Sequence, residues 1–138
     1  MRMLVTGAHG LLGRSLLRLQ KTAELIGCGR GPDPVEGRVY HQLDLTDRSA
    51  LHQLLAAVRP DWVVHTACLT SVDQCETERE LARRVNLEAV EHLIEACGEV
   101  DAGLVQFSTD YVFDGRNGPY SETDEPNPLS YYGALKLE

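Results

Sequence analysis

A tyrosine and a lysine four residues apart, Tyr132 and Lys136, have the side-chain types and the spacing that proton transfer requires. On a helix, residues four apart lie on one face about a turn apart. An ordinary phenol has a pKa of about 10, and a neighbouring cation lowers such a value by about 1 to 3. Two unrelated surface residues would show the same spacing. The pair therefore predicts a proton donor only if the rest of the sequence supports it.

A glycine-rich run, Thr6–Gly13, follows the short apolar segment Met3–Val5 and precedes leucines at helical spacing. Its glycines, Gly7, Gly10 and Gly13, permit a tight turn, close approach to a pyrophosphate and close packing of helix on strand. The start of the helix offers unpaired N–H groups to a phosphate. Strand, glycine turn and helix in this order predict a dinucleotide-binding site.

The residues that follow the second predicted strand, Glu24–Gly29, bear on the choice of cofactor. Dinucleotide folds place an acidic residue here to bind ribose hydroxyls, or an arginine nearby to pair with a 2′-phosphate. Gly29 and Arg30 occupy these positions. We therefore expect Arg30 to favour NADPH, although a solvated loop charge would leave the same pattern.

The remaining segments alternate between strand and helix patterns. Further strands are predicted at 39–43, 62–67 and 103–108. Helices are predicted after Asp44–Asp47, over about 77–97 with Gly98 as the C-terminal stop, and around Tyr132, with a loop at 114–128 before the last. This alternation specifies an α/β fold of the Rossmann type, a doubly wound parallel sheet with strand order 3-2-1-4-5.

Composition and charge limit the function classes. With 43% hydrophobic and 25% charged residues, the 138-residue sequence is predicted to form one domain with a core. A net charge of -8 disfavours a nucleic-acid partner. No apolar run approaches the roughly 18 to 20 residues that cross a bilayer, and no signal-peptide pattern opens the sequence. We expect no membrane partner and a cytoplasmic location.

The cysteines and histidines show no metal-ligand spacing. Neither a CxxC pair nor an HExxH pattern is present, and no Cys/His spacing suits structural zinc. We expect reduced core thiols and no metal site. The residues concerned are Cys28, Cys68, Cys75, Cys97, His9, His41, His52, His65 and His92.

Specific motifs appear in the second half of the sequence. Phe107–Gly115 reads Phe-Ser-Thr-Asp-Tyr-Val-Phe-Asp-Gly, and Tyr132–Leu137 reads Tyr-Gly-Ala-Leu-Lys-Leu. Pro119–Asp124 lies between them, and Asp44–Asp47 and Thr70–Glu76 precede them. With these motifs the chain resembles, over all 138 residues, the extended short-chain dehydrogenase/reductases and specifically the dTDP-4-dehydrorhamnose reductase family.

The resemblance implies roles for individual residues. Thr109 fills the Ser/Thr position of a catalytic trio with Tyr132 and Lys136, and Thr109 and Asp110 fall on substrate-contacting positions. For Asp110, a carboxylate that only stabilises a turn is an equal alternative. Besides Gly13 and Arg30, the expected cofactor-binding residues are Gly7, Gly10, Leu11, Leu12, Asp44, Leu45, Cys68, Leu69, Thr70, Phe107, Tyr132 and Lys136.

The implied activity is NAD(P)H-dependent reduction of a nucleotide-linked 4-keto sugar, as in dTDP-rhamnose biosynthesis. NADPH is the expected cofactor, with NADH left open. Tyr132 would give the proton and Thr109 would bind the carbonyl oxygen. The expected partner is the nucleotide sugar, and a homodimer is compatible with the family. Because this family continues for a comparable length with a substrate-binding lobe, we expect residues 1–138 to be the cofactor-binding part and inactive alone.

Two other functions stay open at this point. A sugar-nucleotide epimerase or dehydratase shares the fold and the Tyr/Lys pair but keeps its cofactor bound through the cycle. The Ser108–Gly115 run, Ser-Thr-Asp-Tyr-Val-Phe-Asp-Gly, favours the reductase. A regulatory subunit resembling the β subunit of methionine adenosyltransferase would look like this family without acting as an enzyme, and the intact trio weighs against it.

Overall fold

A computed structural model describes residues 1–19 and 22–138, which divide into two compact units. The first unit consists of Met1–Cys68 and Ala89–Phe107. The second unit consists of Leu69–Glu88 and Ser108–Glu138. None of the helices in the described ranges combines the length and the apolar character needed to cross a membrane.

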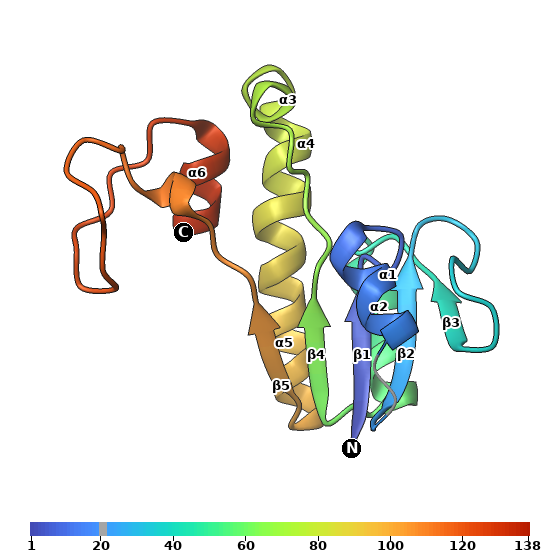
Figure 1. The fold of residues 1–138 in the computed structure, drawn as a ribbon. Helices are drawn as coiled ribbons and strands as arrows, with labels where there is room; N and C mark the ends of the chain where they lie inside the picture. Colours follow the sequence, from blue (N-terminus) through green and yellow to red (C-terminus); the bar gives the residue numbers. More distant parts are fainter. Residues whose placement is uncertain (20–21) are drawn as a thin grey trace. The chain divides into compact units, whose positions relative to one another are not determined.

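The first unit is built on a five-stranded parallel sheet in the order β3-β2-β1-β4-β5 (Figure 1). The predicted Rossmann-type fold and strand order are thus confirmed. The strands that begin at residues 39, 62 and 103 end one or two residues earlier than predicted. The five strands are β1 Arg2–Thr6, β2 Glu24–Gly29, β3 Val39–Gln42, β4 Trp62–His65 and β5 Gly103–Gln106.

Helices cover both faces of this sheet. Helix α1 (Leu11–Leu19) packs on one face, and α2 (Arg48–Val58) and α5 (Ala89–Val100) pack on the other (Figure 1). Successive strand residues point to opposite faces of the sheet. Because helices cover both faces, the side chains on each face must be apolar. The buried clusters contain Val5, Ala8, Leu17 and Leu25 on the α1 face, and Leu4, Ile26, Leu51, Leu55, Val63 and Leu93 on the other.

The start of α2 follows the prediction, whereas the end of α5 does not. Asp47 caps α2 by accepting a hydrogen bond from the Ala50 N–H at 3.0 Å. Gly98, the predicted stop, lies inside α5, which continues to Val100. The left-handed residue that ends this helix is Asp101, with φ 59°, because a short polar side chain tolerates that conformation.

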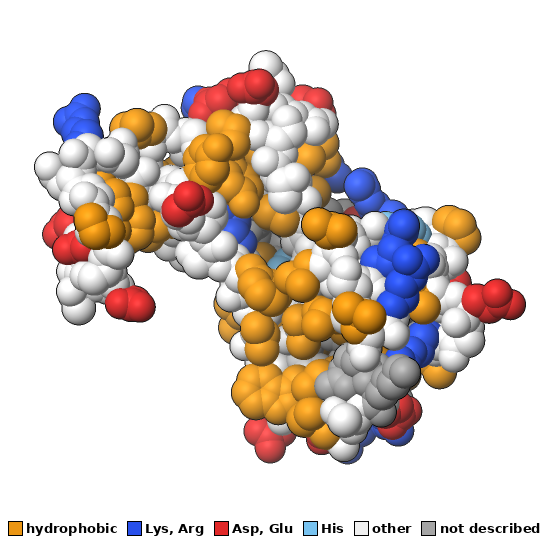
Figure 2. Space-filling view, viewed as in Figure 1, with side chains coloured by type: hydrophobic (Ala, Val, Ile, Leu, Met, Phe, Trp, Pro, Cys, Tyr) orange, Lys and Arg blue, Asp and Glu red, His pale blue; other side chains and the backbone are white. Residues whose placement is uncertain are grey.

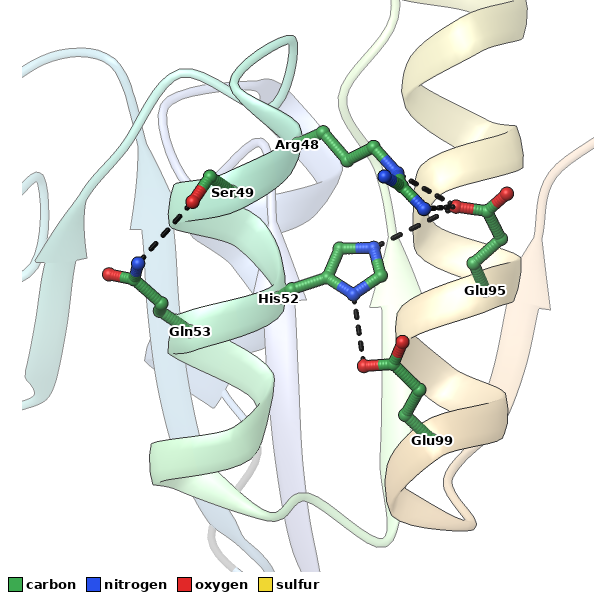
Figure 3. A network of polar contacts seen from close by, with 6 residues as sticks. All are labelled: Arg48, Ser49, His52, Gln53, Glu95 and Glu99. Carbon is green, nitrogen blue, oxygen red and sulfur yellow. Dashed lines mark hydrogen bonds and ion pairs between the residues drawn. The ribbon is translucent and has the colours of Figure 1, made fainter.

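A polar network joins α2 to α5 on their outer face (Figure 3). Arg48 Nη2 lies 2.9 Å from Glu95 Oε2, and His52 Nδ1 lies 3.0 Å from Glu99 Oε2. The His52 Nε2 atom lies 3.8 Å from the same Glu95 oxygen. These residues therefore link the two helices above their apolar contact.

The second unit contains short helices and a long loop. Its helical segments are α3 Val72–Thr77, α4 Arg79–Arg83, a π-helical segment Arg84–Glu88, a 3-10 turn Asp110–Val112 and α6 Tyr131–Leu137. The helix predicted from about residue 77 begins two residues later, at Arg79. A separate helix, α3, precedes it, and Glu78 between the two has non-helical angles. The buried cluster of this unit is Cys75, Ala82, Leu87 and Leu135.

Hydrophobic side chains lie exposed at the β4 and β5 side of the first unit (Figure 2). Trp62 is 43% exposed, Val105 37% and Phe107 42%. Strand β5 is an edge of the sheet, so one row of its backbone groups has no strand partner among the described residues. Like the opposite edge strand, β3, this edge can accept another strand.

Candidate active site

The glycine turn joins β1 to α1 at the carboxyl edge of the sheet. Gly7 has a φ of 69°, and its carbonyl accepts a hydrogen bond from the Gly10 N–H at 2.9 Å. A Cβ added at Gly7 would lie 2.5 Å from the Ala67 nitrogen, and one added at Gly13 would overlap the Gly7 carbonyl. The turn, the helix and the end of β4 therefore pack too closely for side chains at positions 7 and 13.

The start of α1 is suited to an anionic group. The helix begins at Leu11, and the first N–H groups of a helix lack intrahelical partners and carry the positive end of its dipole. Leu11 is 91% exposed and Leu12 43%, so their side chains do not pack in the core. The strand order reverses between β1 and β4, which is where dinucleotides bind in such sheets. The glycine turn therefore fits the pyrophosphate of a dinucleotide.

Other residues expected to bind the cofactor follow the ends of β3, β4 and β5. Asp44 Oδ1 accepts hydrogen bonds from the Thr46 N–H at 3.0 Å and the Thr46 hydroxyl at 2.9 Å. Leu45 is only 9% exposed and packs in the core, so a cofactor would meet its backbone. Cys68 is half-buried and Phe107 is exposed. Because all strands are parallel, these residues share the carboxyl edge with the glycine turn.

The loop after β2 is held in place by side chains of β3. The Tyr40 hydroxyl lies 2.9 Å from the Gly29 carbonyl oxygen and 2.7 Å from that of Gly31, and donates to them. Gln42 Nε2 donates to the Arg30 carbonyl at 2.8 Å, while the Arg30 side chain is exposed. Sequence reasoning missed the roles of Tyr40 and Gln42. The available signal was their place on alternate positions of a short, largely polar strand.

Thr109 and Tyr132 lie on two elements of the second unit that pack together. Thr109 precedes the 3-10 turn, and its hydroxyl accepts from the Tyr111 N–H and donates to Asp110 Oδ1, each at 3.2 Å. The Tyr132 ring meets the Tyr111 ring edge to face, with centroids 5.9 Å apart. The structure therefore brings the 3-10 turn that follows Thr109 into contact with the ring of Tyr132.

Helix α6 carries Tyr132 and Lys136 about one turn apart, as the spacing predicts. Ser130 caps the helix by accepting a hydrogen bond from the Gly133 N–H at 3.1 Å. A Cβ at Gly133 would overlap the Tyr111 carbonyl, so glycine is what lets the helix approach the 3-10 turn. Lys136 is half-buried in the last turn, where the helix dipole favours a cation.

Glu76 anchors the start of α6, a role that sequence reasoning missed. Its Oε1 accepts a hydrogen bond from the Tyr131 N–H at 2.6 Å, and its Oε2 lies 2.7 Å from Arg79 Nη2. The Arg79 guanidinium also lies 4.8 Å from the centre of the Tyr131 ring. The Tyr131 hydrogen bond, and after it Arg79, holds the pKa of Glu76 below its ordinary value. The partners are 55 residues apart, so no local pattern predicts the contact.

Buried Asn86 fixes the residues that follow β4. Its Nδ2 donates to the Leu69 carbonyl at 2.9 Å and its Oδ1 accepts from the Leu69 N–H at 2.8 Å. Asn86 is 4% exposed and lies in the π-helical segment. A buried amide with these two bonds replaces a backbone partner for Leu69. The signal in the sequence was a polar residue between two apolar ones, Val85 and Leu87.

A pocket of about 430 Å³ opens beside Asp110. The Phe113 and Tyr120 rings stack at one wall, with centroids 4.3 Å apart. Asp114 accepts from the Arg116 N–H at 3.0 Å and the Tyr120 hydroxyl at 2.7 Å, and these bonds lower its pKa to about 2. Asp110 both stabilises the turn and borders this pocket, so both interpretations of its carboxylate stand. The lining residues are Asp110, Tyr111, Phe113, Asp114, Gly115, Tyr120, Leu129 and Ser130.

Three of the four cysteines belong to the apolar interior. Cys28, Cys75 and Cys97 are buried, and Cys68 is half-buried. Burial raises the pKa of the Cys28 thiol to about 12 and also raises that of Cys97. These two thiols therefore stay protonated near neutral pH. Within residues 1–19 and 22–138, no three His, Cys, Asp or Glu residues are grouped so that they could hold a metal ion.

Comparison with known sequences finds relatives along the whole chain. A dTDP-4-dehydrorhamnose reductase of Streptomyces griseus is 44% identical over 138 residues, covering 98% of this chain and 42% of that protein. Methionine adenosyltransferase 2 subunit beta of Bos taurus is 39% identical over 140 residues, covering 99% and 41%. The chain thus spans less than half the length of these curated relatives.

Solved structures agree with this relationship. A hypothetical dTDP-4-dehydrorhamnose reductase of Sulfolobus tokodaii matches with a TM-score of 0.89 and 44% identity, covering 99% of this chain and 50% of that one. The dTDP-4-dehydrorhamnose reductase of Bacillus anthracis in complex with NADP matches with a TM-score of 0.85 and 33% identity, covering 99% and 46%. The resemblance inferred from the motifs is confirmed. Because the family model for the RmlD substrate binding domain matches residues 1–138, the protein belongs to that family.

Proposed function

We propose that the protein that contains this chain reduces a nucleotide-linked 4-keto sugar with NADPH, in the manner of a dTDP-4-dehydrorhamnose reductase. One structural observation carries the proposal: Thr109, Tyr132 and Lys136 belong to one compact unit, in which the 3-10 turn packs against the helix that bears the other two. The Streptomyces griseus and Bacillus anthracis reductases, the latter solved with NADP, support the substrate class and the cofactor.

In the proposed reaction, a bound nicotinamide supplies the hydride that reaches the carbonyl carbon of the sugar. Thr109 donates its hydroxyl proton in a hydrogen bond to the carbonyl oxygen, for which the hydroxyl must rotate away from Asp110. Tyr132 transfers its phenolic proton to that oxygen as negative charge develops on it. Lys136, one turn further along α6, stabilises the resulting phenolate and hydrogen-bonds the nicotinamide ribose.

The proposed cofactor site uses the first unit. The turn from Gly7 to Gly13 binds the pyrophosphate, and Arg30 pairs with the 2′-phosphate. A charge-assisted contact of this kind makes NADPH bind at least tenfold more tightly than NADH, about 1.4 kcal/mol. Arg30→Ala should remove most of that difference. Fluorescence titration of both cofactors into both proteins measures it, and equal wild-type affinities would contradict the assignment.

The activity itself is tested by loss of NADPH absorbance in the presence of a dTDP-linked 4-keto-6-deoxy sugar. The reductase consumes one NADPH for each sugar reduced. An epimerase or dehydratase would change the sugar without net NADPH consumption, because its cofactor returns to the starting oxidation state. Sugar conversion without NADPH loss would therefore replace the proposed reaction with the alternative within the same fold.

A regulatory subunit is the second candidate, and the relationship to methionine adenosyltransferase 2 subunit beta favours it. Such a subunit would bind a methionine adenosyltransferase catalytic chain and would leave the keto sugar unreduced. Size-exclusion chromatography of a mixture with the catalytic chain from the same organism distinguishes the candidates. A stable complex together with absent sugar reduction would support the subunit.

The proposal also includes a cytoplasmic location and a homodimer. The absence of a disulfide among Cys28, Cys68, Cys75 and Cys97 supports a reducing compartment. The exposed edge strand β5 and the apolar side chains beside it could bury surface against further protein. Sedimentation of the purified protein measures the oligomeric state, and a monomer at all concentrations would contradict the homodimer.

A further inference from the structure

An imidazole lies beside the position that binds ribose hydroxyls in many dinucleotide folds. Gly29 ends β2, where an acidic residue often stands. A Cβ added at Gly29 would lie 3.0 Å from His9 Nδ1 and 3.3 Å from the Tyr40 hydroxyl. A side chain at this position would require the ring of His9 to shift by a few tenths of an ångström. Glycine at position 29 therefore lets a ring nitrogen lie beside the place where the acidic residue often stands.

Two contacts fix the His9 ring. Its Nε2 lies 2.6 Å from the Pro32 carbonyl oxygen, and the ring meets Tyr40 edge to face with centroids 5.9 Å apart. Gly31 leaves room for it, since a Cβ there would lie 2.9 Å from His9 Nε2. His9 is nevertheless exposed to solvent, so a ligand can reach the ring.

The Pro32 contact determines which ring nitrogen can respond to a ligand. A carbonyl oxygen only accepts hydrogen bonds, so Nε2 must carry a hydrogen. Nδ1 then has a lone pair in the neutral ring and a hydrogen in the protonated ring. The neutral ring can accept from a ribose hydroxyl, whereas the protonated ring can donate to a phosphate. No described residue hydrogen-bonds Nδ1, so the atom is available to a bound cofactor.

We propose that His9 is a second determinant of cofactor choice, whose protonated Nδ1 hydrogen-bonds the 2′-phosphate of NADPH beside Arg30. The inference rests on the proposed binding of a dinucleotide at the glycine turn. It adds a residue of that turn, one position before Gly10, to the recognition of the adenosine ribose. His9 thereby joins pyrophosphate binding and 2′-phosphate binding in one segment.

The charged surroundings of His9 come from several elements. Tyr40 lies against it from β3, Cys28 belongs to β2, and Arg30 and Asp33 belong to the loop that follows. Burial, and to a smaller extent Cys28 and Asp33, raises the pKa of Tyr40, so its hydroxyl stays protonated and keeps its contacts with the loop. Lys and Arg side chains gather over the α1 and β2 part of this unit (Figure 2). An anion thus meets a positive surface here.

Binding measurements on His9→Gln test the inference. Isothermal titration of NADPH and NADH into wild type and variant measures both affinities. We expect His9→Gln to bind NADPH about tenfold more weakly and NADH within about twofold of wild type.

Arg30→Ala is the matched control, because it removes a permanent charge from the same site. It should weaken NADPH binding by a similar factor and leave NADH binding within about twofold of wild type. If His9→Gln weakened the binding of NADPH and of NADH equally, His9 would only stabilise the loop, and the inference would be overturned. A wild-type protein that binds neither cofactor would instead contradict the proposed function, and the inference with it.

A gain-of-function variant covers the case in which His9→Gln does not fold. Replacing His9 by Ala removes the ring that crowds position 29, so the double variant His9→Ala, Gly29→Asp restores the arrangement in which a carboxylate binds the ribose hydroxyls. We expect this protein to prefer NADH over NADPH, and Gly29→Asp alone to bind both more weakly because the ring is still present. Unchanged NADPH preference in the double variant would contradict the assignment.

Discussion

The two units of this chain position their site residues by different physical means. In the first unit, the glycine turn is set by backbone geometry at the edge of a parallel sheet, as the φ of Gly7 and the contact between Gly13 and the Gly7 carbonyl show. In the second unit, the helix that carries Tyr132 is held by side-chain bonds to backbone groups, from Glu76 and Ser130.

This difference has consequences for mutation. A backbone-defined site tolerates changes of neighbouring side chains but no added Cβ at its glycines, because an entire turn must then move. A site held by single side chains loses its geometry stepwise, one anchor at a time. Damage to the first unit should therefore appear in folding, and damage to the second chiefly in turnover.

The largest effect is expected for Gly7→Ala. The positive φ disfavours any other residue, and the new Cβ would lie 2.5 Å from the Ala67 nitrogen. Strain plus overlap should lower the free energy of unfolding by about 3 kcal/mol or more. Urea denaturation measures the loss, with Gly98→Ala as control.

Gly98 suits that purpose because it lies inside α5 and a Cβ there would have open space around it. Gly98→Ala should stabilise the protein by about 0.5 to 1 kcal/mol through helix propensity. Equal stability of the two variants would show that the backbone of the glycine turn is not the constraint proposed here.

Gly133→Ala should have the next largest effect, and a different kind of effect. The added methyl would push α6 away from the Tyr111 carbonyl, an overpacking that costs about 1 to 3 kcal/mol. Turnover should fall more than tenfold, whereas NADPH affinity should stay within a few-fold, since the proposed pyrophosphate site lies in the other unit. Steady-state kinetics and cofactor titration on one sample measure turnover and NADPH affinity separately. Equal losses of turnover and affinity would show that the two units do not position their residues independently.

Glu76→Gln is predicted to have a smaller, pH-dependent effect. A carboxyl whose pKa is lowered by folding stabilises the native state above its ordinary pKa of about 4.3, and this stabilisation is lost as pH falls through the lowered value. The variant should therefore unfold at lower urea concentration than wild type at neutral pH but not in strong acid. Exposed Glu80 has no ion pair among the described residues, and Glu80→Gln should change neither midpoint. If the urea midpoints of wild type and Glu76→Gln differed by the same amount at every pH, the effect of Glu76 would come from packing and not from its charge.

The smallest effect is expected at the outer face of the first unit, in the network of Figure 3. The Arg48 and Glu95 side chains are 60% and 49% exposed, so their ion pair is largely screened by solvent. Arg48→Ala should cost at most about 1 kcal/mol at low salt and less at high salt. Thermal unfolding at two salt concentrations measures it, and a larger, salt-independent loss would mean that Arg48 contributes chiefly by packing.

The sequence predicted the first unit well because its determinants are local. The apolar run of β4, the glycine turn and the Asp47 cap are each readable within a few residues, and parallel pairing follows from alternation with helices. The end of α5 was misplaced because Gly98 can remain helical, while the left-handed residue is Asp101. The intrinsic preference of glycine for helix ends does not by itself decide whether the helix ends at Gly98 or at Asp101.

The second unit was less predictable because its contacts join distant segments. Tyr131 meets Glu76 across 55 residues, and Leu69 meets Asn86 across 17. The family motif indicated which residues the proposed trio would contain, but not that Gly133 and Tyr111 set the distance between helix and turn. The role of His9 was equally hidden, since its partner is a backbone carbonyl of a loop.

The most direct test of the proposed chemistry is Tyr132→Phe in the protein that contains this chain, because only a hydroxyl is lost. We predict a fall in turnover of about a hundredfold or more with NADPH affinity within a few-fold of wild type. Pre-steady-state kinetics should verify that hydride transfer limits the rate in the variant. A variant that keeps more than about a tenth of wild-type turnover under that condition would contradict Tyr132 as the proton donor.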